Sequence, residues 1–149
     1  MFDLGEADFA FEIAKRALDM WKAETDFSYC TYECFGIETQ RGGWFHNFGG
    51  LSAPVCIWAN AYYKPGTVTS GLDIWVDKEI TTADSAEIDF KYYGGSDKYT
   101  ILVCLNDKNK YRAELNGSPV EINERSAGII EITLGGDVKG GKLCVCVKE

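Results

Sequence analysis

The hydrophobic pattern of this chain changes its period once, near Thr67, and this change limits the possible folds more than any other feature. Before Thr67, apolar residues recur at steps of three and four, which is typical of amphipathic helices. After it, apolar and polar residues alternate, which predicts strands. The sequence therefore predicts an α+β protein in which a short helical segment precedes antiparallel strands.

The second part predicts a β-sandwich of the jelly-roll or immunoglobulin-like type. Alternation runs through about seven short segments, with turn signals at roughly ten-residue spacing. Asn116-Gly117 is a strong hairpin signal between two of them. Ile74 and Val76 alternate with Trp75, so Trp75 faces away from them, either exposed or packed on the helical segment. We expect a helical domain over residues 1–64 and a sandwich over residues 65–149.

The first part predicts two helices with unusually wide apolar surfaces. Residues 8–23 carry two adjacent apolar stripes, and residues 53–62 are apolar nearly all round. Helices of this kind must pack against other apolar surfaces, and a chain of 149 residues has few elements that can cover them. Residues 26–50 lie between them, rich in glycine and aromatic residues and without a clear period. Long segments of this kind inside compact domains are often functional.

This irregular stretch resembles part of a known enzyme family. It reads Tyr-Glu-Cys-Phe-Gly over residues 32–36, a Gly-rich run that includes Gly42-Gly43, and Phe-Gly-Gly-Leu-Ser over residues 48–52. Glycoside hydrolases with an (α/α)6 barrel, such as trehalases and processing α-glucosidases, carry a similar run near the end of the barrel. Gly50 stands where that family often has Trp, and Gln40 where it commonly has Gly.

The resemblance implies roles for five residues. Glu33 matches the family's general base, the carboxylate that activates water during inverting glycoside hydrolysis. The expected substrate-binding residues, which would stack on or hydrogen-bond a sugar, are Phe35, Trp44, His46 and Phe48. For His46, the only histidine, the alternative to sugar binding is a structural role. Glycines in the same run would let the backbone approach the ligand.

The resemblance also implies that the chain is incomplete as a catalyst. The family's second carboxylic acid comes from earlier in a barrel of many helices, and two helices cannot supply it. We therefore expect a C-terminal or accessory portion of a glycoside hydrolase that is inactive alone, with the remainder of a barrel or a homo-oligomer as partner. Two alternatives stay open: a non-catalytic carbohydrate-binding module and a structural or assembly sandwich.

Charge and cysteine placement narrow the remaining function classes. A net charge of −8 argues against nucleic acid and anionic membrane surfaces, and favours neutral ligands such as carbohydrate. Cys144 and Cys146 share one face of a predicted strand, and Cys104 lies in an apolar run, so we expect reduced thiols. No metal or cofactor motif is present. The sequence shows no export signal or membrane span, which predicts a cytoplasmic protein.

Overall fold

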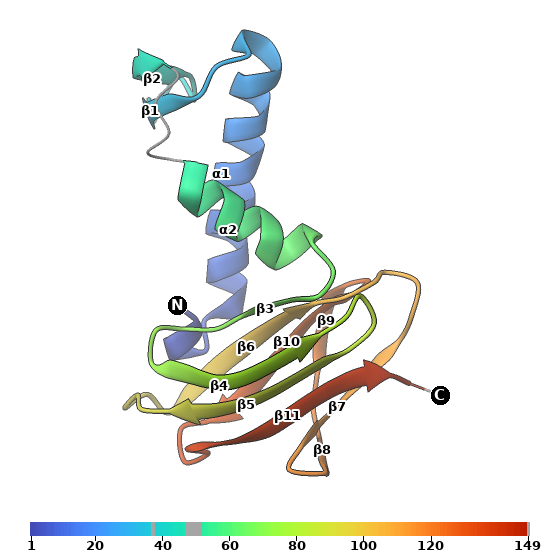
Figure 1. Cartoon of the computed structure of the whole chain (residues 1–149). Helices are drawn as coiled ribbons and strands as arrows, with labels where there is room; N and C mark the ends of the chain where they lie inside the picture. The colour runs from blue at the N-terminus through green and yellow to red at the C-terminus, as the bar shows by residue number, and fades with distance from the viewer. Residues whose placement is uncertain (37, 47–51, 149) are drawn as a thin grey trace. The chain divides into compact units, whose positions relative to one another are not determined.

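A computed structural model describes residues 1–36, 38–46 and 52–148, and it confirms the α+β class with an antiparallel sandwich (Figure 1). Its helical elements are the 3-10 helix η1 (Phe2–Leu4), α1 (Ala7–Ser28) and α2 (Ser52–Tyr63). Its strands are β1 (Tyr32–Phe35), β2 (Gly42–His46), β3 (Thr67–Thr69), β4 (Ile74–Thr81), β5 (Ala86–Tyr92), β6 (Lys98–Cys104), β7 (Tyr111–Leu115), β8 (Ser118–Val120), β9 (Asn123–Ser126), β10 (Ile129–Gly135) and β11 (Gly140–Val147).

The chain divides into two compact units. The β unit contains Met1–Ala10 and Asn60–Glu149, and the helical unit contains Phe11–Ala59. The helical unit therefore interrupts the β unit in the sequence, because the first ten residues pack with strands that follow much later. The boundary at residue 64 between a barrel-derived segment and the sandwich stays a prediction.

Two antiparallel sheets form the β unit. One sheet has the strand order β3-β6-β10-β9, and the other has the order β4-β5-β11-β7-β8. Every ladder between neighbouring strands is antiparallel. The strands expected from alternation are all present, and Asn116 and Gly117 adopt the positive φ angles that a tight hairpin needs, 52° and 78°.

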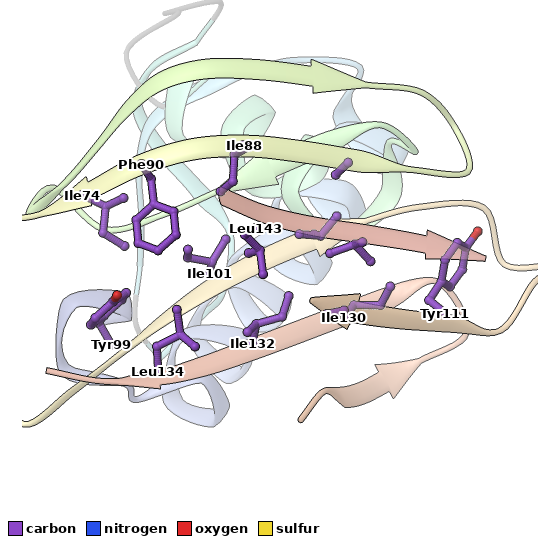
Figure 2. Close-up of a cluster of buried hydrophobic side chains, with 14 of the residues drawn as sticks. Ile74, Ile88, Phe90, Tyr99, Ile101, Tyr111, Ile130, Ile132, Leu134 and Leu143 are labelled. Carbon is purple, nitrogen blue, oxygen red and sulfur yellow. The ribbon is translucent and has the colours of Figure 1, made fainter. Parts of the chain in front are cut away.

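The core lies between the two sheets (Figure 2). Ile88 of β5 and Leu143 of β11 come from one sheet, while Ile101 of β6 and Ile132 of β10 come from the other. Each of these side chains is at most 1% exposed. Burying one such side chain contributes roughly 1.5–3 kcal/mol, so this layer supplies most of the unit's stability.

The outer face of the four-stranded sheet is also covered. Leu102 and Cys104 of β6 point away from the core yet are buried, and η1 contacts β6. Glu131 of β10 is buried on this face in an ion pair with Arg125, which also pairs with Asp8 in the first turn of α1 at 2.6 Å. The N-terminal segment is thus tied to the sheet by charge as well as by apolar contact.

The helical unit buries few side chains of its own. Helix α1 extends to Ser28, beyond the expected end near residue 23, and Tyr29 ends it with a φ of 57°. Among the described residues 11–59, the buried side chains are Ala14, Glu24 and Val55. Large apolar side chains, including Phe27 and Ile57, are exposed. The described residues of this unit therefore bury fewer apolar side chains than those of the sandwich do.

The six cysteines are free thiols in the structure, and Cys104 is buried. In the described part of the chain, neither helix is long and apolar enough to span a membrane.

The sandwich core generates the first prediction. Replacing Ile132 by Ala should lower the free energy of unfolding by about 2–5 kcal/mol, because the substitution leaves a cavity between the sheets. Ile80 on β4 is 51% exposed, so Ile80→Ala should change the free energy of unfolding by less than about 0.5 kcal/mol. Urea unfolding measures both values. Equal effects of the two substitutions would mean that the core lies elsewhere.

Candidate functional site

A two-stranded hairpin carries the sequence-predicted site. Strands β1 and β2 pair antiparallel, with Phe35 opposite Gly42, Cys34 opposite Gly43 and Tyr32 opposite His46. Residues 26–50 were expected to be irregular, so this hairpin is a correction. The period of two was hidden because the hairpin pairs with no larger sheet and therefore has no single buried face.

The strand register places Glu33 of β1 across from Trp44 of β2. Between the pairs at Tyr32 and Cys34 the register shifts, so that two residues of β2, Trp44 and Phe45, lie across from Glu33 alone. Such a bulge bends a strand and redirects its side chains, and bulges are common beside active sites. Glu33 and Phe35 alternate with Cys34 and therefore lie on one face of the hairpin.

The five predicted site residues are described to different extents. Glu33 and Phe35 lie in β1 and are half-buried. Trp44 and His46 lie in β2, but their side chains fall outside the description. Phe48 lies outside the described residues altogether. The backbone thus brings four of the five onto one hairpin, whereas their roles in binding or catalysis stay predictions.

A buried carboxylate on α1 anchors this hairpin. Glu24 is 3% exposed, and its Oε2 accepts hydrogen bonds from Arg41 Nε at 2.6 Å and from the Gly42 N–H at 3.0 Å. Arg41 Nη2 also donates to Glu24 Oε1 at 3.3 Å, which makes the pair bidentate. The Arg41 guanidinium lies over the Phe27 ring, 4.2 Å from its centroid. Both ends of this contact belong to the helical unit.

Gly42 is required where β2 begins. A Cβ atom at this position would lie 2.1 Å from the Tyr32 ring, which covers the glycine. The absence of a side chain thus lets Tyr32 pack on the strand while the Gly42 N–H reaches Glu24. Sequence reasoning identified Gly42 through the resemblance but missed Glu24, since nothing marks one glutamate of a polar helix end as buried.

Electrostatics distinguish Glu24 from an ordinary surface carboxylate. Hydrogen bonds from Arg41 and from the Gly42 N–H lower the pKa of the Glu24 carboxyl to about 2, and burial opposes them only in part. The same hydrogen bond raises the pKa of Arg41. Glu24 therefore stays ionised over the physiological range. A carboxylate held in this way suits anchoring and does not suit proton transfer.

A cavity of about 420 Å³ lies in the β unit. Tyr62 and Tyr63 at the end of α2 line it together with Asn106, Asp107, Lys108 and Ser126. Cys104 is also part of its wall, and burial raises the pKa of that thiol to about 11, so it is protonated and unreactive at neutral pH. The cavity can hold a small ligand, and its lining combines hydroxyl, amide, carboxylate and ammonium groups with apolar side chains.

Comparison with known proteins assigns no family. No protein-family model matches the chain, and no curated protein or solved structure shows significant similarity to it.

The Glu24 anchor generates the second prediction. Its folded-state pKa is depressed to about 2 from an ordinary value of 4.5, so its stabilising effect is fully present above pH 4.5 and is lost as the pH falls toward 2. In nuclear magnetic resonance spectra, the Gly42 amide proton should titrate with an apparent pKa of about 2. Glu24→Gln should abolish that titration and speed hydrogen exchange of Gly42. A Gly42 titration near 4.5 would contradict the anchor.

Proposed function

We propose that this chain forms the C-terminal end of a glycoside hydrolase, in which the helical unit completes an (α/α)6 barrel and the β unit is the appended sandwich. The proposal rests on the sequence resemblance over the hairpin and on the difference in buried apolar side chains between the two units. In this view the chain is inactive alone and becomes part of a catalyst when the remaining helices are present.

The exposed apolar surface of the helical unit is the observation that carries the proposal. Phe27 is 71% exposed and Ile57 is 60% exposed, each on a helix of the unit. Soluble monomers seldom expose many large apolar side chains together, and such surfaces mark contacts with other polypeptide. In a barrel made of paired helices, the neighbouring helices would cover these exposed apolar side chains.

The proposed chemistry assigns one step to this chain. In inverting hydrolysis, a carboxylic acid protonates the glycosidic oxygen while a second carboxylate removes a proton from the attacking water. The water oxygen bonds to the anomeric carbon as the bond to the leaving oxygen breaks. Glu33 is the candidate for the second carboxylate, and the acid comes from the missing part of the barrel.

The hairpin geometry fits such a role for Glu33. Glu33 lies opposite the aromatic residues Trp44 and Phe45 at a bulge, and Glu24 holds the base of the same hairpin. A catalytic carboxylate needs a backbone that is fixed before substrate arrives, because misplacement by about 1 Å can cost a hundredfold in rate. The Glu24–Arg41 pair provides that fixation from within the helical unit.

The third prediction concerns catalysis. The chain is to be co-expressed with the neighbouring polypeptide that supplies the remaining barrel helices, and assayed on a panel of p-nitrophenyl glycosides. Glu33→Gln should lower kcat by about 10²- to 10⁴-fold, because a general base contributes that much. The matched control is Glu38→Gln, which alters an exposed carboxylate of the same hairpin and should leave kcat unchanged. Equal activity of the two variants would refute the role of Glu33.

The fourth prediction concerns the apolar surface itself. The isolated chain should bind the dye ANS and self-associate through the helical unit, and Phe27→Ser with Ile57→Ser should reduce both. Fluorescence titration and light scattering measure the two effects. Leu72→Ser is the matched control, because Leu72 is 99% exposed but belongs to the β unit. A wild-type chain that is monomeric and binds no dye would contradict the proposal.

A further inference from the structure

The outer face of the five-stranded sheet has two unlike halves. Toward the end of β4 it carries a lattice of ion pairs, with Glu87 accepting from Lys142 at 2.9 Å and lying 3.7 Å from Lys78. Interspersed charges of this kind are typical of a solvated surface. Toward the start of β4 the same face carries two large aromatic side chains instead.

These aromatic residues are Trp75 and Tyr93, and the register places them together. Trp75 of β4 lies directly opposite Lys91 of β5, so both side chains point to the same face. Tyr93 follows Lys91 by two residues and therefore shares that face, as a diagonal neighbour of Trp75. Trp75 is 63% exposed and Tyr93 is 72% exposed. Tryptophan is normally well buried, so its exposure on a strand is unusual.

The backbone beneath the two rings is held firmly. The Tyr93 N–H donates to the Asp73 carbonyl at 2.9 Å, which continues the ladder beyond the last paired residues. The Asp3 carboxylate in turn accepts from the N–H groups of Leu72 and Asp73, each at 3.0 Å. The turn that follows Tyr93 is fixed by the Ser96 N–H, which donates to the Tyr92 hydroxyl at 3.1 Å. Aromatic side chains on such a support lose little freedom when they bind a ligand.

The surface beside Lys91 on the next strand carries no side chain. Gly140 of β11 pairs with Lys91, and a Cβ atom at this glycine would lie 2.4 Å from the Phe90 carbonyl oxygen. The position thus accepts only glycine. Lys91, which lies between Trp75 and Gly140 across the sheet, is therefore bordered on its β11 side by bare backbone, where a ligand can approach the sheet closely.

The charges on this half of the face disfavour an anionic ligand and can hydrogen-bond a ligand with many hydroxyl groups. Asp77 forms an ion pair with Lys91 at 2.6 Å, and Asp73 and Asp89 belong to the same face by register. The carboxylates disfavour an anion, and the Lys91 ammonium group already pairs with one of them. Both kinds of group can hydrogen-bond hydroxyls, and the aromatic rings can stack on the apolar face of a sugar ring.

We propose that Trp75, Tyr93 and the Asp77–Lys91 pair form a binding site for neutral oligosaccharide on the outer face of the sandwich. The site lies wholly within the β unit and uses none of the residues assigned to hydrolysis. It does not rest on the proposed function, because binding at this face requires neither Glu33 nor the rest of a barrel.

The test uses the full 149-residue chain and four soluble probes. Maltohexaose, cellohexaose and xylohexaose are neutral, and hexagalacturonate is the anionic comparison. Amide chemical shifts in a nitrogen-15 spectrum should move at Asp73, Trp75, Lys91 and Tyr93 with at least one neutral probe, and should stay unchanged with hexagalacturonate. Trp75→Ala should weaken that binding about tenfold or more, as for aromatic residues at the centre of a binding surface.

Three control variants separate stacking from other causes. Ile80→Ala removes an exposed apolar side chain from the same strand and should leave affinity unchanged. Tyr93→Phe keeps the ring and should retain most of the binding, whereas Tyr93→Ala should lose it. Glu33→Gln should bind like wild type even if it abolishes hydrolysis by the completed enzyme.

Four results would overturn the site. They are no shift with any neutral probe at millimolar concentration, shifts confined to the cavity residues Tyr63 and Asn106, equal affinity of wild type and Trp75→Ala, or preferential binding of hexagalacturonate.

Discussion

Burial of β6 on both of its faces is the constraint on which the β unit depends. Ile101 and Val103 enter the core between the sheets, while Leu102 and Cys104 are buried on the opposite face. A strand of this kind needs a layer on each side, since an exposed apolar face would cost roughly 1.5–3 kcal/mol for each large side chain. The five-stranded sheet covers one side, and the N-terminal segment at η1 covers part of the other. The β unit consequently includes the first residues of the chain.

The helical unit is organised differently, because the described part of it buries a polar contact and few apolar side chains. Glu24 receives hydrogen bonds from Arg41 and from Gly42, and this contact fixes where the hairpin begins. A carboxylate can be buried at low cost only when charge and hydrogen bonds compensate for lost hydration. The arrangement orders the hairpin that carries Glu33 yet leaves Phe27 and Ile57 exposed. The described part of this unit thus combines a defined local geometry with exposed apolar side chains.

How far the sequence predicted this structure depends on how local each signal is. The strands around Ile88 and Ile101 were predicted because alternation directly reflects a buried and an exposed face. The sequence likewise predicted that Trp75 faces away from Ile74, and Trp75 is exposed whereas Ile74 is buried. The hairpin at residues 32–46 was missed because its support comes from Glu24 and Arg41, which are 17 residues apart. A contact between one helix residue and one loop residue leaves no periodic trace in a sequence.

The most direct test of the central claim, that the described part of the helical unit has less apolar support than the β unit, is hydrogen–deuterium exchange of the chain alone. In the chain alone, amides of α1 from residue 11 onward should exchange much faster than those of β6 and β10, because few buried contacts hold the helix. Protection of α1 equal to that of β6 in the chain alone would contradict the account.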